Sequence, residues 1–423
     1  MNQTKKILLK LAIIGMTCGL NFQGYAQDSI TVDDLRQFSY PFDIQDGVLS
    51  GPGAEIMTKA ISNAHVVMLG NNSRNKLEAD LDLALAEELD KSNYNTLIME
   101  IGPNSADIVN RLSGHSSGIL DAFKKMNQEY FFEAGGLQFM AIPDFKYVGA
   151  SQLLDYIKER DWSFDAIGVD SWTGYKLVTD ELYNNLSKSN QQFHTQLYQS
   201  SIDLLDSLYA NMEGQSYDDV LGLTSGLKAS ASYNLFLEEM SAFDINTELL
   251  KQLRFSIDYW WMYGSKQGYK KNKLSSQRNK VLIKEILDGL DYNFEKDKLF
   301  LKMWRGHLTN GVTRNGFYGV GNMLMELANY HGHSSLNIGV LSRFTIEDGV
   351  IEDRLDNPEQ VPMIQRPFVS LGEADQWVLV DMRHFNETFY WGNYILTIDM
   401  LKMMRRFDMI IIPKADSKAK VNN

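Results

Sequence analysis

"HVVMLGNNSRNKLEADL", residues 65–81, is the stretch from which the fold prediction starts. Its apolar run ends at Gly70 and opens into five polar residues, 71–75, before leucines recur at every fourth position, 77, 81, 85 and 89. That spacing is typical of an amphipathic helix. A second apolar run, "NTLIMEIG" at 95–102, follows. Strand, helix and strand within about 35 residues make a βαβ unit, so the sequence predicts an α/β fold with a mostly parallel sheet flanked by helices.

Five further short runs have the length and β-branched content of strands buried on both faces. They are "FDAIGVD" (164–170), "KLFLKMW" (298–304), "SLNIGVL" (335–341), "WVLVDMR" (377–383) and "FDMIIIP" (407–413). From about 174 to 297 the patterns are helical instead, which predicts a helical insertion or subdomain within one continuous domain, 27–423. Inside it, "GSKQGYKKNKLSSQRNK" (264–280) predicts a lysine-rich surface loop that leads into a helix at about Ser275 or Ser276.

The first residues predict a secretory signal peptide, 1–26. Three lysines surround an apolar stretch, and Gly24-Tyr25-Ala26 offers a cleavage site after Ala26. A membrane helix is a competing interpretation, but the stretch is short and interrupted. Lipidation at Cys18 is another, although the preceding Gly-Met-Thr fits a lipoprotein signal poorly. We therefore expect an exported, periplasmic or secreted protein without a stable membrane span after cleavage.

Charge and cysteine content restrict the function classes. The 423-residue chain has a formal charge of −13, which cleavage would move to −16, so we expect no binding to nucleic acid or anionic lipid surfaces. Cys18 is the only cysteine. The mature chain would then have no disulfide, no thiolate nucleophile and no cysteine-ligated metal. The partner expected is a small molecule, while the oligomeric state does not follow from the sequence.

Polar residues at the predicted strand ends are the candidates for a site, because ligands bind beyond the carboxyl ends of parallel strands. They are Asn71, Arg74, Glu100, Asp170, Arg305 and His307, and Arg278 at the start of the helix after the lysine-rich loop could reach the same cleft. Asn72 or Ser73 can instead simply cap the following helix. Glu100 needs a partner, since an unpaired buried carboxylate is costly. Arg74 and Arg278 fit a structural ion pair as well as a catalytic cation.

Other residues predict no metal or cofactor. His331 and His333 lie in the polar turn "NYHGHSS" without a nearby acid or cysteine, which favours a surface turn over a metal site. The chain has no G-x-S-x-G, P-loop or H-E-x-x-H motif, and no G-x-G-x-x-G after the first strand. The aromatic run "DYWWMYG" (258–264) could line a cleft, but helical spacing of aromatic residues is more typical of a core.

The order of these segments resembles the erythromycin esterase family, over almost the whole mature chain. The family opens with a strand, Leu-Gly-Glu, two small residues and His, where this chain has "LGNNSR", 69–74. Its later signatures correspond to Glu100, to Gly-Val-Asp at 168–170, to Arg278, and to "WRGH" at 304–307 in place of His-Asn-x-His. The resemblance implies an α/β fold with a helical insertion that hydrolyses a lactone ester without a metal.

The departures from that pattern concern the acid–base groups. Asn71 and Arg74 replace the family glutamate and general-base histidine, and Trp304 replaces another histidine. An arginine cannot accept a proton near neutral pH. Two hypotheses follow. The chain is an esterase-like hydrolase, impaired or altered, in which His307, Glu100 and Arg278 are catalytic and Asn71, Arg74, Asp170, Trp304 and Arg305 line the cleft. Alternatively, it is a non-catalytic descendant, a pseudoenzyme that binds a polar ligand or has a structural role.

Overall fold

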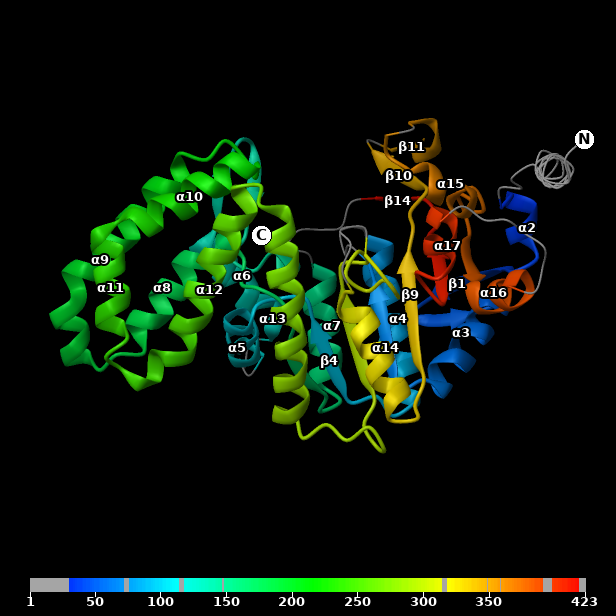
Figure 1. Cartoon of the computed structure of the whole chain (residues 1–423), viewed down its shortest axis with the longest axis horizontal. Coiled ribbons are helices and arrows are strands. Elements are labelled where there is room, and N and C mark those ends of the chain that lie inside the picture. Colours follow the sequence, from blue (N-terminus) through cyan, green and yellow to red (C-terminus); the bar gives the residue numbers. More distant parts are fainter. Residues whose placement is uncertain are drawn as a thin grey trace, which may run out of the picture.

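A nine-stranded sheet forms the centre of one lobe of this computed structural model (Figure 1). The structure describes residues 30–71, 76–113, 118–146, 148–313, 318–347, 349–357, 359–390 and 398–417. The strand order is β2-β1-β12-β13-β9-β3-β8-β4-β7. The strands are β1 (Ser39–Gln45), β2 (Val48–Ser50), β3 (Val66–Gly70), β4 (Thr96–Met99), β7 (Ser163–Ala166), β8 (Leu299–Met303), β9 (Ser335–Val340), β12 (Trp377–Asp381) and β13 (Met409–Ile412).

The predicted fold class is confirmed, and each of the seven apolar runs contains a strand of this sheet. β13, β9, β3, β8, β4 and β7 are parallel neighbours, with Phe300 of β8 paired between Val67 and Leu97. β12 is antiparallel to β13, and β1 and β2 continue the sheet as antiparallel strands. β1 and β2 were not among the predicted strands. Six parallel strands therefore place their carboxyl ends at one edge.

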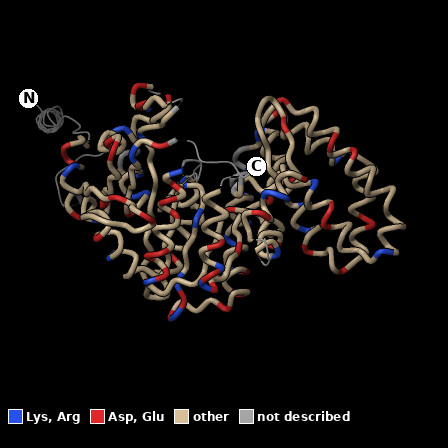
Figure 2. The backbone as a smooth tube through the Cα atoms, turned by 180° about the vertical axis from the view of Figure 1, so that it is seen from behind, with Lys and Arg blue, Asp and Glu red and all other residues tan. Residues whose placement is uncertain are grey.

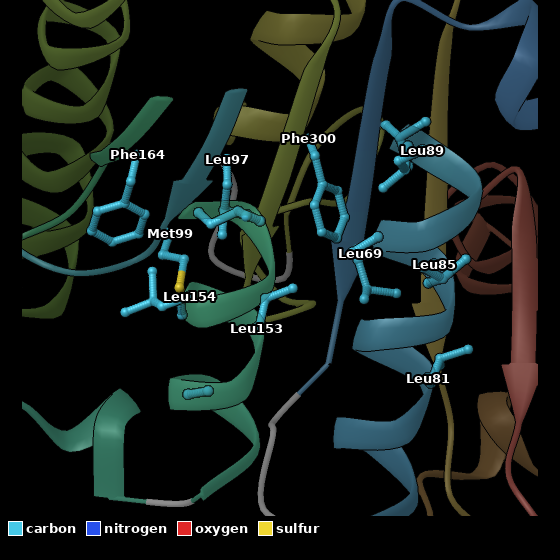
Figure 3. Packing of buried hydrophobic residues seen from close by; sticks show 14 of the residues in the cluster. Leu69, Leu81, Leu85, Leu89, Leu97, Met99, Leu153, Leu154, Phe164 and Phe300 are labelled. Atoms are coloured by element: carbon cyan, nitrogen blue, oxygen red, sulfur yellow. The ribbon is translucent and has the colours of Figure 1, made fainter. Parts of the chain in front are cut away.

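The leucine stripe of residues 77–89 belongs to α4 (Lys76–Lys91), as the spacing predicted. Its buried leucines, Leu81, Leu85 and Leu89, pack against Leu69 and Phe300 of the sheet (Figure 3). α3 (Pro52–Asn63) and α7 (Val148–Lys158) contribute to the same core. The other face of β3, β8 and β4 packs against α13 (Gly268–Gly289) and α14 (Val320–Tyr330). Both faces of the central strands are thus covered by apolar side chains.

Helices form a second lobe beside the sheet (Figure 1). Its core is a separate apolar cluster that includes Leu205, Phe236 and Leu253. The helices are α8 (Tyr175–Asn184), α9 (Lys188–Ala210), α10 (Tyr217–Ala229), α11 (Ala231–Met240) and α12 (Thr247–Gly264). α12 packs against both α10 and α13, so it joins the helical lobe to the sheet lobe.

The predicted lysine-rich loop is wrong. α13 begins at Gly268, so most of the lysine-rich stretch is helical and Arg278 lies in the middle of this helix rather than at its start. Lysines at a helix N-terminus oppose the helix dipole, which favours the loop interpretation. Lysine is nevertheless a good helix former, and the buried Leu282, Ile283 and Ile286 anchor the same helix to the sheet. Once this C-terminal half of α13 is anchored, extending the helix toward Gly268 adds one backbone hydrogen bond per residue.

Smaller elements complete the described chain. They are α2 (Val32–Arg36), α5 (Pro103–Leu112), α6 (Ile119–Tyr130), β5 (Phe132–Ala134), β6 (Leu137–Phe139), β10 (Phe344–Glu347), β11 (Val350–Asp353), α15 (Arg366–Val369), α16 (Met382–Tyr390), α17 (Ile398–Met404) and β14 (Asp416–Ser417). The predicted signal peptide, including Cys18, lies outside the described residues. No helix within the described ranges is long and apolar enough to cross a membrane.

Acidic and basic residues are interspersed over both lobes (Figure 2). The formal net charge of the whole chain is −13.

Candidate functional site

Glu100 follows β4 directly, at the edge where the parallel strands end. One carboxylate oxygen, Oε1, pairs with Nδ1 of His307. The other, Oε2, accepts a hydrogen bond of 2.7 Å from the backbone N–H of Trp304. The prediction that Glu100 has a partner is therefore confirmed. Glu100 and His307 form a carboxylate–imidazole pair, called the dyad below.

A tight turn after β8 positions His307. Its backbone N–H donates to the carbonyl of Trp304 at 2.9 Å. The Trp304 ring folds over Gly306, where an added Cβ would lie only 2.1 Å from a ring carbon. Trp304 also meets the His307 ring edge-on, with centroids 5.3 Å apart and planes at 89°. Gly306 is therefore required for this arrangement, while Trp304, 51% exposed, borders the dyad.

The dyad opens on a cavity of about 480 Å³. The sheet lobe contributes the dyad, Trp304 and the segments after β4 and β7. The rest of the wall includes residues of α12 from the helical lobe and of α13, which covers the sheet. Ligand sites in proteins are commonly clefts of roughly this size, with apolar and aromatic walls and a few placed polar groups. The cavity therefore has the size for a small-molecule ligand and contains an acid–base pair.

Three aromatic residues of α12, Tyr259, Trp260 and Tyr263, form one side of the cavity. The alternative in which "DYWWMYG" lines a cleft is thus confirmed for these three, and the core interpretation holds in part, because Trp260 and Tyr263 also pack against the helical core. Burial raises the pKa of Tyr259, and the Glu100 charge raises it further, against a hydrogen bond from Ser275 of α13. The Tyr259 phenol stays protonated. The spacing of Tyr259, Trp260 and Tyr263 indicated neighbouring positions on one helix, but it could not indicate whether they face the core or the cavity.

Asp170 lies four residues beyond the end of β7, not at the strand end, because the strand stops at Ala166. Its buried carboxylate accepts hydrogen bonds from the backbone N–H and hydroxyl of Ser105, at 2.9 and 2.8 Å. Its carbonyl accepts from Ser256 and from Trp260 Nε1, at 2.6 and 2.8 Å. Burial raises the pKa of Asp170. The residue ties α5 to α12 behind the cavity, while its neighbours Val169 and Ser171 line the wall.

Arg278 is not among the residues that line the cavity. Its guanidinium donates to Gln252, lies 3.9 Å from a Glu285 carboxylate oxygen and sits over the Phe255 ring, 5.1 Å from the centroid. Burial lowers the pKa of Arg278 without removing its charge. Its helix neighbours Ser275 and Asn279 line the cavity instead. Neither was among the predicted site residues, because their spacing alone does not indicate which surface of the helix meets the cavity.

Asn71 takes part in a separate buried cluster. Its side-chain amide donates to Asp82 of α4 at 2.7 Å, and Lys302 of β8 pairs with the same carboxylate at 3.0 Å. All three residues are at most 4% exposed. Alternation along the strands directs Lys302 to the α4 face, whereas Met303 packs on the α13 face. The structure therefore does not bring Asn71 into the cavity.

Arg305 and Arg74 complete the predicted site residues. Arg305 donates to the carbonyl of Val340 at 2.9 Å, and burial lowers its pKa. Arg305 is not on the cavity wall. It also lies so close to β3 that a Cβ added at Gly70 would meet its backbone at 2.8 Å. Arg74, with Asn72 and Ser73, lies outside the described residues.

Several described histidines outside the dyad form ring contacts. His333 stacks on His65 with centroids 3.7 Å apart, and His331 stacks on Phe294 at 4.5 Å. Within the part of the chain that the structure describes, no group of three or more His, Cys, Asp or Glu residues is arranged to hold a metal.

Three solved structures resemble this one, although no family model and no curated protein matches the sequence. A protein from Bacillus cereus shares 13% identity over 94% of this chain and 99% of its own, with a TM-score of 0.51. A succinoglycan biosynthesis protein shares 14% sequence identity over 92% of this chain and 97% of its own, with a TM-score of 0.51. A mutant erythromycin esterase in its open conformation shares 12% sequence identity over 87% of this chain and 95% of its own, with a TM-score of 0.49. The likeness to the first two shows a shared fold.

Proposed function

We propose that this protein is an ester hydrolase in which Glu100 and His307 provide the acid–base chemistry. The observation that carries the proposal is the pairing of the two side chains at the wall of a cavity large enough for a substrate. The resemblance of the strand-end pattern to the erythromycin esterase family supports the reaction class. The substrate we propose is a small carboxylic or lactone ester, and the mechanism uses no cofactor.

Glu100 fixes the orientation of the imidazole. Because Oε1 binds Nδ1 of His307, the other ring nitrogen, Nε2, is the one that would accept a proton. A water molecule gives that proton to Nε2 while its oxygen attacks the ester carbonyl carbon. The resulting tetrahedral intermediate collapses by breaking the bond to the alcohol oxygen. The imidazolium then returns its proton to the leaving alkoxide, so the products are a carboxylic acid and an alcohol.

Charge on the attacked carbonyl oxygen requires a donor in the cavity. Arg278 and Arg74 were candidates for this role, but the Arg278 guanidinium contacts Gln252 and Glu285, and Arg278 is not on the wall. Tyr259 lines the cavity, and its raised pKa keeps the phenol protonated. A neutral phenol can donate a hydrogen bond to a developing oxyanion. We therefore assign that role to Tyr259.

A non-catalytic, ligand-binding protein is the second candidate. Asn71 stands where the resembled family has a glutamate, and its amide is committed to Asp82 rather than to the cavity. Arg74 stands where that family has its general base. In this alternative the same cavity binds a small molecule and the Glu100–His307 pair only shapes the wall.

The proposed place of action is outside the cytoplasm. Support comes from Lys5, Lys6 and Lys10 around the apolar leader and from the small residues Gly24 and Ala26 at the predicted cleavage site. Sequencing the N-terminus of the exported protein tests this, with a first residue of Gln27 expected.

Hydrolysis of a panel of lactones and simple aryl and alkyl esters tests the reaction class. We expect activity in the natural protein that falls by about 10² to 10⁴-fold in His307→Ala, the usual contribution of general-base assistance. His331→Ala, in an exposed turn, is the matched control and should keep full activity. No activity in the natural protein on any ester of the panel would favour the non-catalytic candidate.

A further inference from the structure

Asn279 of α13 has an unusual environment on the cavity wall. The residue is only 6% exposed, and its Oδ1 atom is buried without a hydrogen-bond partner within the described chain. A buried amide without a partner costs about 1–3 kcal/mol. Native proteins rarely keep such a group unless a ligand or water completes its hydrogen bonds.

The neighbouring polar groups on the wall already have partners. Ser105 donates to Asp170, Ser171 hydrogen-bonds to Thr173 at 2.7 Å, and Ser275 is engaged by Tyr259. Both oxygens of Glu100 are used by the turn after β8. Asn279 therefore differs from these groups in having hydrogen-bonding capacity left for a ligand.

The charge of the wall restricts that ligand. Its described lining residues include Glu100 but no Lys or Arg. An anionic ligand would lose its hydration and gain no permanent cation in return. The aromatic faces of α12 and the half-exposed Trp304 instead offer surfaces on which the apolar face of a ring can pack.

We infer that Asn279 is a specificity-determining residue that hydrogen-bonds a hydroxyl group of an uncharged, ring-containing ester. The inference rests on the proposed function for the ester itself, because Asn279 and the dyad line the same cavity. The Asn279 carboxamide can accept from such a hydroxyl or donate to it. Substrates that lack the hydroxyl or carry an anionic group are discriminated against.

Binding of three matched probes tests the inference without requiring hydrolysis. The first probe is phenyl β-D-glucopyranoside. The second, 2-phenoxytetrahydropyran, is the hydroxyl-free ether with the same ring, and the third, phenyl β-D-glucuronide, adds a carboxylate. Trp260 and Trp304 on the wall allow binding to be followed by tryptophan fluorescence. We expect the glucoside to bind about 2- to 10-fold more tightly than the hydroxyl-free ether, as one hydrogen bond predicts. The glucuronide should bind more weakly than the glucoside.

Asn279→Leu, of similar volume, should lower the affinity for the glucoside by about 2- to 10-fold and leave that for the hydroxyl-free ether unchanged. Asn279→Ala is the second variant if leucine disturbs the fold, and Asn329→Leu on the exposed face of α14 is the control. An equal loss for both probes, or a preference that survives in both variants, overturns the inference. Because no probe is an ester, a lack of hydrolytic activity would refute the proposed function and leave this test valid. Hydrolytic activity together with no preference for the hydroxyl-bearing probe would support the proposed function and refute the inference about Asn279.

Discussion

Single residues decide which groups remain available for chemistry at the carboxyl edge of the sheet. Lys302 and Met303 are adjacent in β8, yet Lys302 pairs with Asp82 near α4 and Met303 packs near α13. Glu100 and His307 line the cavity, whereas Asn71 hydrogen-bonds to Asp82 of the buried Asp82–Lys302 pair. Neighbouring strand ends thus supply two separate polar clusters, and one of them lines the cavity.

Asn71→Asp tests the structural role of the second cluster. The new carboxylate would face Asp82 without the amide donor that now bonds it at 2.7 Å. We expect the free energy of unfolding to fall by about 1–3 kcal/mol, the usual cost of a buried group left without its partner. Urea denaturation of the variant and the natural protein measures this. Unchanged stability would show that the hydrogen bond is not needed.

Asp408 predicts a pH dependence of stability. Burial raises its pKa to about 6, and its carboxylate accepts a 2.7 Å hydrogen bond from the backbone of Asn337. A carboxyl whose pKa is higher in the folded state stabilises the fold at low pH, and that contribution is lost as pH rises through the folded pKa. We expect Asp408→Asn to remove a decline of about 1–2 kcal/mol between about pH 4 and pH 6. Denaturation at several pH values checks this, and identical pH profiles would refute it.

At the scale of elements, α13 matters because it carries both the anchored Arg278 and the cavity residues Ser275 and Asn279. Lys273→Pro tests whether its first half is helical. Proline removes a hydrogen bond and clashes with the preceding turn, so we expect about 3 kcal/mol of lost stability. Lys273→Ala, the matched control, should be close to neutral. A lysine-rich loop, as the sequence pattern predicted, would tolerate both changes equally.

The strands could be predicted because continuous short apolar runs indicate strands buried on both faces, and α4 because its leucines repeat with helical spacing. "VVMLG", "TLIM" and "LFLKM" are buried throughout, and the fourfold leucine spacing matches the packed face of α4. The start of α13, the use of Asp170 as a tie between helices and the exposure of Tyr259 to the cavity depend on which elements meet. No local pattern in a single sequence specifies those contacts. Glu100 and His307 were predicted as site residues because each lies at or just after the carboxyl end of a predicted parallel strand.

At the scale of the whole molecule, the cavity belongs to neither lobe alone. The sheet lobe supplies Glu100 and His307, and α12, whose inner face packs into the helical core, supplies Tyr259, Trp260 and Tyr263. Asp170 connects the two through hydrogen bonds from Ser105, Ser256 and Trp260. Two solved structures at 13% and 14% identity share the fold, so the fold itself tolerates extensive sequence change.

The most direct test of the account is a double-mutant cycle on the dyad, measured as kcat/KM for the best ester of the panel. If Glu100 acts only by positioning His307, then Glu100→Gln and His307→Ala each lower kcat/KM, and the double variant falls no further than His307→Ala alone. We expect a loss of about 10² to 10⁴-fold for His307→Ala and for the double variant. Full activity in His307→Ala, or losses that multiply as for independent residues, would contradict the proposal that Glu100 and His307 work as one acid–base unit.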